Sequence, residues 1–167
     1  ITCDAAKVLE LNPYMSDLDM AYYVGSGIHF TWGLLRHRGT YIHSSAILLD
    51  GKAYLFSADS GTGKSTHTSF WRKALSEGHE VVMVNDDKPF VALTAQGAVL
   101  YGSPWSGKHG LDTNITVPLQ GICILERGKE NRIARIDPEE ALPMLLHQTY
   151  RPLDANACFA ELVQSLA

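Results

Sequence analysis

Between residues 58 and 66 the chain reads Ala58-Asp59-Ser60-Gly61-Thr62-Gly63-Lys64-Ser65-Thr66, shortly after the apolar run 53–56. Glycines in such a stretch let successive backbone N–H groups turn inward around phosphate oxygens, while a lysine reaches the outer phosphates and a hydroxyl binds Mg²⁺. Alanine occupies the first glycine position of the pattern G-x-x-x-x-G-K-[ST], but every group that would touch phosphate is kept. The stretch predicts a phosphate-binding loop whose nucleotide-binding residues are Asp59, Ser60, Gly61, Thr62, Gly63, Lys64, Ser65 and Thr66.

Length and composition indicate a single globular domain spanning residues 1–167. The chain is 46% hydrophobic and 19% charged, and its formal net charge of -4 provides no basic surface for nucleic acid. No apolar run approaches the length of a membrane span, and the first residues do not resemble a secretion signal. We therefore expect a cytoplasmic protein with neither a membrane nor a nucleic-acid partner. Three widely spaced cysteines favour reduced thiols over a disulfide framework or a zinc site.

The segments before the loop predict strands. Residues 1–17 show little periodicity and are expected to form a loosely ordered N-terminal arm. Residues 21–24, 28–35 and 41–49 are rich in aromatic and β-branched side chains, which favours three strands. Asp50-Gly51 is a strong signal for a two-residue hairpin turn, so strand 41–49 is expected to pair antiparallel with the strand that enters the loop.

The segments after the loop predict alternating helices and strands. We expect a helix over 65–77 and a buried strand over 81–84. Further strands are expected over 90–93, 98–101, 117–126 and 132–136. One helix is expected to begin near residue 138, and a second is expected over 155–166. The antiparallel hairpin before the loop argues against a doubly wound fold. The predicted fold class is α/β: a single domain with a mixed parallel/antiparallel sheet, a P-loop and flanking helices.

Two acidic residues, Asp86 and Asp87, follow the predicted buried strand. In phosphate-loop enzymes a carboxylate at this position binds Mg²⁺ beside the loop hydroxyl, here that of Ser65. The adjacent carboxylate could accept a proton from an attacking hydroxyl. Neighbouring side chains on a strand point to opposite faces, so both can converge only if the backbone is irregular there. Which aspartate binds the metal and which is the base stays open.

Three further residues each have two interpretations. His43 lies in a predicted strand, where it could be either a structural histidine or a catalytic one. Lys108 lies in the long polar loop 102–114, either as an exposed lysine or as a cation that stabilises a transferring phosphoryl group. Trp105, in the same loop, either walls a substrate pocket or anchors the loop.

Three motifs together resemble the catalytic domain of the HPr kinase/phosphorylase family. They are Ile42-His43-Ser44-Ser45, the loop from Ser57 to Ser65, and Asn85-Asp86-Asp87, which match in type, order and spacing over roughly residues 40–135. The core Ser60-Gly61-Thr62-Gly63-Lys64-Ser65 is also similar to the loop of ATP-dependent phosphoenolpyruvate carboxykinase, which shares that fold. Segment 102–108 matches neither family, which leaves the acceptor open.

The resemblance implies a set of roles. Lys64 would bind the phosphates of ATP, Ser65 and one of the two aspartates would bind Mg²⁺ or Mn²⁺, the other aspartate would be the base, and His43 would match the active-site histidine. In the expected mechanism we take Asp86 as the metal ligand and Asp87 as the base. It also implies that several copies of the chain assemble into a homo-oligomer.

The expected activity is an ATP- and Mg²⁺-dependent kinase, with Lys108 as a further catalytic candidate. The γ-phosphoryl group would be moved to a hydroxyl acceptor, such as a serine of a protein or peptide. Two alternatives remain: a non-catalytic nucleotide-binding regulatory module, and a small-molecule or carboxykinase-related kinase.

Overall fold

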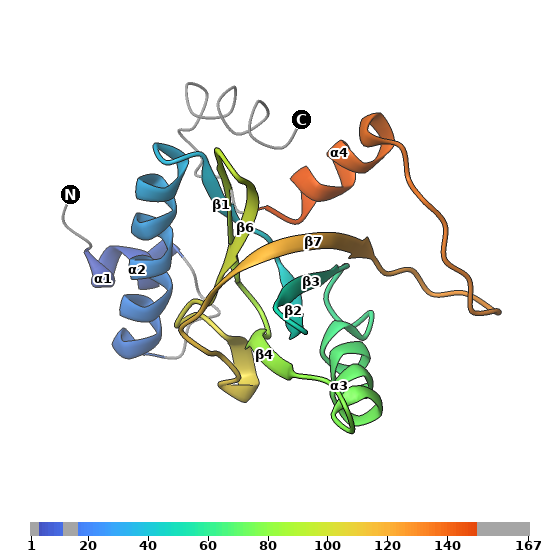
Figure 1. The fold of residues 1–167 in the computed structure, drawn as a ribbon. Coiled ribbons are helices and arrows are strands. Elements are labelled where there is room, and N and C mark those ends of the chain that lie inside the picture. The colour runs from blue at the N-terminus through green and yellow to red at the C-terminus, as the bar shows by residue number, and fades with distance from the viewer. Residues whose placement is uncertain (1–3, 12–16, 150–167) are drawn as a thin grey trace.

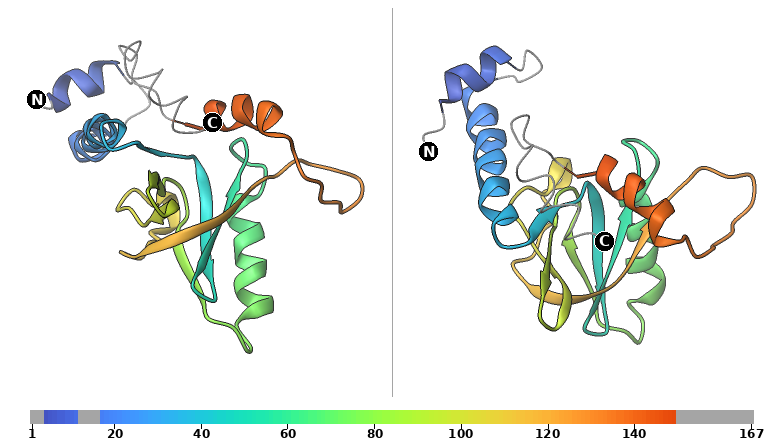
Figure 2. Two further views of the ribbon diagram at one scale, coloured as in Figure 1. Left: turned by 45° about the horizontal axis from the view of Figure 1, so that its top comes forward. Right: turned by 90° about the horizontal axis from the view of Figure 1, so that it is seen from above.

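The computed structural model describes residues 4–11 and 17–149, which form an α/β domain built on a seven-stranded mixed sheet (Figure 1). The strands lie in the order β1-β5-β6-β7-β3-β2-β4. Helices α2 and α3 flank opposite ends of this strand order: α2 lies beside β1, and α3 packs on β2, β3 and β4 (Figure 2). The elements are α1 (Ala5–Leu11), α2 (Leu18–Leu35), β1 (Gly39–Tyr41), β2 (Ser44–Leu49), β3 (Lys52–Ser57), α3 (Lys64–Leu75), β4 (Val81–Asn85), β5 (Phe90–Thr94), β6 (Gly97–Tyr101), η1 (Gly107–His109), β7 (Thr116–Ile124) and α4 (Pro138–His147).

The predicted hairpin before the loop is confirmed. Strands β2 and β3 pair antiparallel from Ser44 opposite Ser57 to Leu49 opposite Lys52. Asp50 and Gly51 in the turn both have positive φ, 50° and 78°, as a two-residue turn of type I′ requires. Strand β3 is parallel to β7 on its other side, so the sheet is mixed as expected.

Several strands end at the same edge of the sheet because of the directions in which they run. Strand β2 is antiparallel to both of its neighbours, β3 and β4, so those two strands run in the same direction. The first residues of β2 therefore lie beside the last residues of β3 and β4. Strand β7 ends there as well, because its Ile124 is paired with Ser57. The loop that follows β3 and the aspartates that follow β4 consequently emerge close together.

Apolar side chains from the sheet, together with Ile42 just after β1, make the core. Its buried members include Ile42, Leu55, Val84, Leu100 and Val117, all at most 3% exposed. Trp71 of α3 adds a second packed layer, since its ring lies 5.1 Å from Phe56 and 5.4 Å from Tyr54 of β3. Burial of aromatic surface of this kind fixes α3, and with it the loop that precedes α3, against the sheet.

Most predicted elements after residue 50 are confirmed within two residues, but the two strands expected over 21–24 and 28–35 are wrong. Both segments belong to the 18-residue helix α2. The Asp17 carboxylate accepts a hydrogen bond from the backbone N–H of Met20 and caps the helix N-terminus. Gly27 provides room for the indole of Trp105, which a Cβ there would approach to 3.0 Å. Tertiary packing and a cap therefore outweigh the local preference of aromatic and β-branched residues for strands.

Other expectations need smaller corrections. The strand expected over 41–49 is two strands, β1 and β2, with a break at Ile42 and His43. Residues 132–136 form no strand: the segment between β7 and α4 pairs with none of the described strands, and Ile133 is 89% exposed. The N-terminal arm expected over 1–17 contains helix α1 in its described part. The helix expected over 155–166 lies outside the described residues.

Within the described part of the chain, none of the helices combines the length and the hydropathy needed to span a bilayer.

Candidate functional site

The predicted phosphate loop spans residues 58–63 between β3 and α3. Gly61 and Gly63 have φ of 77° and 115°, a left-handed conformation that favours glycine, and Gly63 caps α3. Helix α3 begins at Lys64, so its unpaired N–H groups and the positive end of its dipole face the loop. Arg127, which follows β7, donates a hydrogen bond from Nη2 to the carbonyl of Gly61 at 2.8 Å. The loop therefore has the backbone of an anion cradle with a guanidinium beside it.

The loop lysine is folded back onto its own loop. The Nζ of Lys64 donates to the carbonyls of Ala58 at 2.8 Å and Asp59 at 3.2 Å, and the residue is 8% exposed. Burial lowers the pKa of Lys64, while the nearby carboxylates of Asp87, Asp59 and Asp86 act in the opposite direction. A buried ammonium surrounded by carboxylates and held by neutral carbonyls is suited to exchange those carbonyls for phosphate oxygens.

Asp86 is held by a buried hydroxyl from β2. The Oγ of Ser45 donates to Asp86 Oδ1 at 2.6 Å and lies 2.7 Å from the Oγ1 of Thr68 on α3. Thr68 also reaches the carbonyl of Ser65 at 3.1 Å. This chain of hydroxyls ties the first turn of α3 to the end of β4 through β2. The position of Asp86 relative to Ser65 is thereby fixed by the buried hydroxyls of Ser45 and Thr68.

The two aspartates face the same region because Asn85 forms a turn. Its Oδ1 accepts hydrogen bonds from the backbone N–H groups of Asp87 at 2.8 Å and Lys88 at 2.7 Å, which ends the regular strand. Its Nδ2 donates to the backbone carbonyl and the hydroxyl of Ser103 in the long loop. The irregularity that convergence of the carboxylates requires is therefore made by one buried amide.

Asp87 lies between a lysine and a histidine. Lys88 Nζ forms an ion pair with Asp87 Oδ2, and His43 Nε2 lies 3.6 Å from Asp87 Oδ1. Gly107 packs on the same aspartate, because a Cβ added at residue 107 would lie 3.0 Å from the Cβ of Asp87. Burial and the charge of Lys64 lower the pKa of His43, with Asp87 opposing them, which favours the neutral imidazole near pH 7. The site thus holds a carboxylate and a neutral imidazole side by side.

The end of α4 contacts both His43 and the phosphate loop. The backbone N–H of His43 donates to the carbonyl of Gln148 at 2.8 Å, and Ile42 pairs with Thr149 in an isolated bridge. The side-chain oxygen Oε1 of Gln148 lies 3.2 Å from His43 Nδ1. Its side-chain nitrogen Nε2 donates a hydrogen bond to Asp59 Oδ1 at 2.8 Å. A residue about a hundred positions away in the sequence is thereby part of the site.

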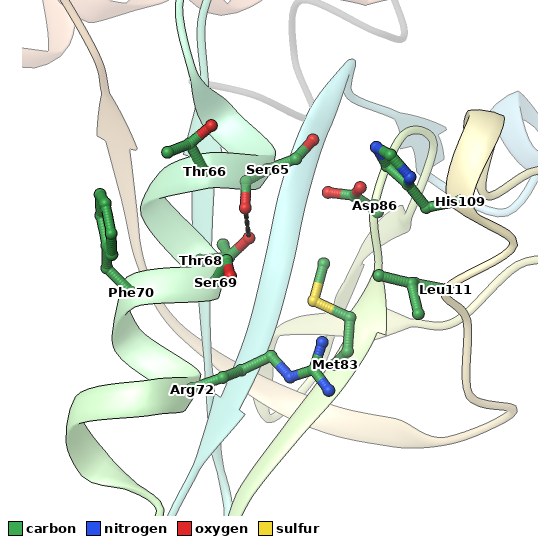
Figure 3. Close-up of a pocket in the computed structure, with 10 residues that line it drawn as sticks. All are labelled: Ser65, Thr66, Thr68, Ser69, Phe70, Arg72, Met83, Asp86, His109 and Leu111. Carbon is green, nitrogen blue, oxygen red and sulfur yellow. Dashed lines mark hydrogen bonds between the residues drawn. The ribbon is translucent and has the colours of Figure 1, made fainter.

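A pocket of about 320 Å³ opens beside Asp86, between α3 and the long loop (Figure 3). The Ser65 hydroxyl and the Asp86 carboxylate point toward each other at one end of it, and Arg72 lies toward the other. His109 and Leu111 contribute from the long loop. The described residues contain no cluster of three or more His, Cys, Asp or Glu side chains that could hold a metal. One hydroxyl and one carboxylate oxygen suit Mg²⁺, which keeps several waters and binds substrate phosphates.

The two remaining candidates, Trp105 and Lys108, have different surroundings. Trp105 anchors the long loop: its Nε1 donates to the carbonyl of Tyr23 at 2.8 Å and its ring packs on Phe30 and Phe90. Lys108 lies in η1 and is exposed, with no hydrogen bond or ion pair to any described residue of the site, so its catalytic role stays a prediction.

Sequence reasoning missed several residues that contact the predicted ones, among them Ser45, Lys88, Arg127 and Gln148. Ser45 could have been found from the hairpin register, because residue 45 lies opposite Phe56 near the end of the strand that enters the loop. Lys88 is adjacent to the aspartate pair. Arg127 and Gln148 reach the site only through the path of the chain after β7, which local spacing does not specify.

Comparison of the chain with protein-family models, with curated proteins and with solved structures finds no match in any of the three.

Proposed function

We propose that this protein is an ATP- and Mg²⁺-dependent phosphotransferase of the HPr kinase-like type, which moves the γ-phosphoryl group to a hydroxyl acceptor. The observation that carries the proposal is the meeting of Lys64, Ser65, Asp86 and Asp87 at one edge of the sheet. Asp86 and Asp87 both lie near enough to Lys64 to influence its charge state. A loop lysine, a loop hydroxyl and paired carboxylates are the parts that phosphoryl transfer needs.

The phosphate loop would bind the nucleotide. Lys64 Nζ and the N–H groups at the start of α3 would bind the β- and γ-phosphates, with the Arg127 guanidinium beside Gly61 as a further cation. Ser65 and Asp86 would hold Mg²⁺ or Mn²⁺. The cation supplies charge neutralisation at the phosphates. The hydrogen bond from Ser45 holds Asp86 in place for this role, so little rearrangement is needed when the nucleotide binds.

Asp87 would act on the acceptor. The acceptor oxygen forms a bond to the γ-phosphorus, the bond between that phosphorus and the β–γ bridging oxygen breaks, and ADP leaves. The hydroxyl proton passes to the Asp87 carboxylate, which is paired with Lys88 and has His43 Nε2 3.6 Å from its Oδ1. Gly107 packs directly on Asp87, so the loop 102–114 borders the place where an acceptor would lie. The acceptor that we propose is a serine in a protein or peptide.

The test is transfer of label from ATP. The purified protein is incubated with Mg²⁺, [γ-³²P]ATP, peptides that each contain one serine, and a panel of sugars and hydroxy acids. We expect labelled acceptor from the wild type and a loss of about 10²-fold or more in Asp87→Asn, with ATP affinity changed only a few-fold. Asp50→Asn, in an exposed turn at the opposite end of β2 and β3 from the phosphate loop, is the matched control.

Two results would contradict the proposal. Tight ATP binding without ADP release or labelled acceptor would favour a nucleotide-binding regulator instead. Transfer that is undiminished in Asp87→Asn would remove Asp87 from the mechanism.

A further inference from the structure

Gln148 occupies an unusual position for a residue at the end of a helix, because one amide contacts two parts of the proposed site. Its Nε2 lies 2.8 Å from Asp59 Oδ1 of the phosphate loop, and its Oε1 lies 3.2 Å from His43 Nδ1. Its backbone carbonyl accepts from the N–H of His43 at 2.8 Å. Side chain and backbone therefore attach the same glutamine to His43.

The chemistry of these contacts determines which atoms carry protons. A carboxylate only accepts hydrogen bonds, so the Gln148 group that faces Asp59 is the NH₂. The other end of the amide, Oε1, then faces His43, and a carbonyl oxygen also only accepts. The proton between Gln148 and His43 must consequently belong to His43 Nδ1.

A neutral imidazole carries one N–H, so a proton on Nδ1 leaves Nε2 with a lone pair. Nε2 is the nitrogen that faces Asp87, at 3.6 Å from Oδ1, which is too long for a direct hydrogen bond. Two proton acceptors that face each other across this distance leave a place for the O–H of a third group. The arrangement suits an acceptor hydroxyl whose proton leaves during transfer.

We propose that Gln148 is a positioning residue that holds His43 in the Nδ1–H form, presents the unprotonated Nε2 beside Asp87, and links this arrangement to the phosphate loop through Asp59. The inference rests on the proposed phosphotransferase function for its purpose, but the tautomer itself does not depend on turnover. Gln148 acts through His43 and touches neither nucleotide nor acceptor.

The test uses the full chain labelled with ¹⁵N at histidine, and two-bond ¹H–¹⁵N spectra that report which ring nitrogen carries the proton. The chain has seven histidines, so the His43 signals are identified by their loss in His43→Asn. We expect the wild type to show the Nδ1–H form. Gln148→Met keeps a side chain of similar length without the amide, and we expect the Nε2–H form to emerge in it. Gln148→Glu keeps an oxygen that accepts from Nδ1, so Nδ1–H persists.

His147→Asn is the matched control. His147 Nε2 lies 3.5 Å from the same oxygen of Asp59 but makes no contact with His43, so this variant alters the neighbouring contact with the loop and leaves the tautomer unchanged. In the transfer assay we expect Gln148→Met to lower kcat about tenfold or more with the KM for ATP within about threefold, and His147→Asn to retain wild-type kcat.

The inference is overturned if wild-type His43 is mainly Nε2–H, or if Gln148→Met leaves the Nδ1–H form unchanged. The wild-type spectrum decides which tautomer His43 adopts even if a variant at residue 148 does not fold. If the wild type transfers no phosphoryl group, the proposed function fails while the spectra still decide the role of Gln148.

Discussion

Ser45 Oγ lies 2.6 Å from Asp86 Oδ1, and both residues are at most 8% exposed. The serine comes from the first residues of β2 and the aspartate from the turn after β4, so the contact joins two strands that are separated by about forty residues in the chain. A hydroxyl that donates to a buried carboxylate both satisfies the charge and fixes its direction. This pair therefore connects the stability of the sheet edge with the geometry of the candidate metal site.

Replacement of Ser45 by alanine is expected to weaken both properties. The Asp86 carboxylate loses a charge-assisted hydrogen bond and Thr68 loses a neighbour, which costs about 1.5–3 kcal/mol in the free energy of unfolding. We also expect a higher Mg²⁺ concentration for half-maximal ATP binding. Urea unfolding and a Mg²⁺ titration measure the two effects. Ser76→Ala, at the exposed C-cap of α3, is the control, and equal effects in both variants would refute the role of Ser45.

Replacement of Lys64 by methionine is expected to abolish most ATP binding without unfolding the protein. The ammonium donates its hydrogen bonds to the carbonyls of Ala58 and Asp59, so methionine fills the space and removes the positive charge that phosphate needs. Calorimetric titration with ATP and Mg²⁺ measures the loss, which we expect to reach about tenfold or more. Lys73→Met, on the exposed last turn of the same helix, should bind ATP as the wild type does. Unchanged binding in Lys64→Met would contradict the loop assignment.

Gly102→Ala is expected to destabilise the long loop severely. A Cβ at this position would lie 1.9 Å from the carbonyl oxygen of Thr113 and 2.9 Å from its carbonyl carbon, so the backbone must move. Gly33→Ala is the matched control, because a Cβ there meets nothing within 4 Å and alanine favours the helix by about 0.5–1 kcal/mol. We expect the midpoint temperature of thermal unfolding to fall in Gly102→Ala and to rise or stay unchanged in Gly33→Ala. A Gly102→Ala protein as stable as the wild type would show that the loop has a different backbone path.

The pH dependence of stability tests the turn between β2 and β3. Hydrogen bonds from the His79 side chain and the backbone N–H of Glu80 lower the pKa of Asp50. A carboxyl whose folded pKa is below its unfolded value adds stability that is complete above the unfolded pKa, about 3.9, and is lost as the pH falls through the folded value.

Asp50→Asn keeps a residue that tolerates the positive φ at this position but removes the charge. We expect the urea midpoint of the wild type to exceed that of Asp50→Asn near pH 7. The difference is expected to shrink steadily below about pH 4. A constant difference across this range would mean that ionisation of Asp50 does not contribute.

The sequence predicted well where a local pattern has a single structural solution. Asp50-Gly51 between two apolar runs specified a tight hairpin, because few other residues accept positive φ at both turn positions. The run from Asp59 to Lys64 likewise specified a glycine-dependent loop before a helix. Local pattern failed for helix α2, where aromatic and β-branched residues favour strands but packing against β5 and Trp105 stabilises a helix.

By itself, the sequence determined the loop, the hairpin that enters it, the buried strand and the two aspartates that follow it, since each depends on neighbours within a few residues. Only the tertiary structure decided which groups meet at this edge of the sheet. Ser45 reaches Asp86 because β2 lies antiparallel between β3 and β4, and Gln148 reaches His43 because α4 ends beside the break between β1 and β2. Contacts of that kind depend on the register and direction of distant segments, which side-chain type and local spacing do not encode.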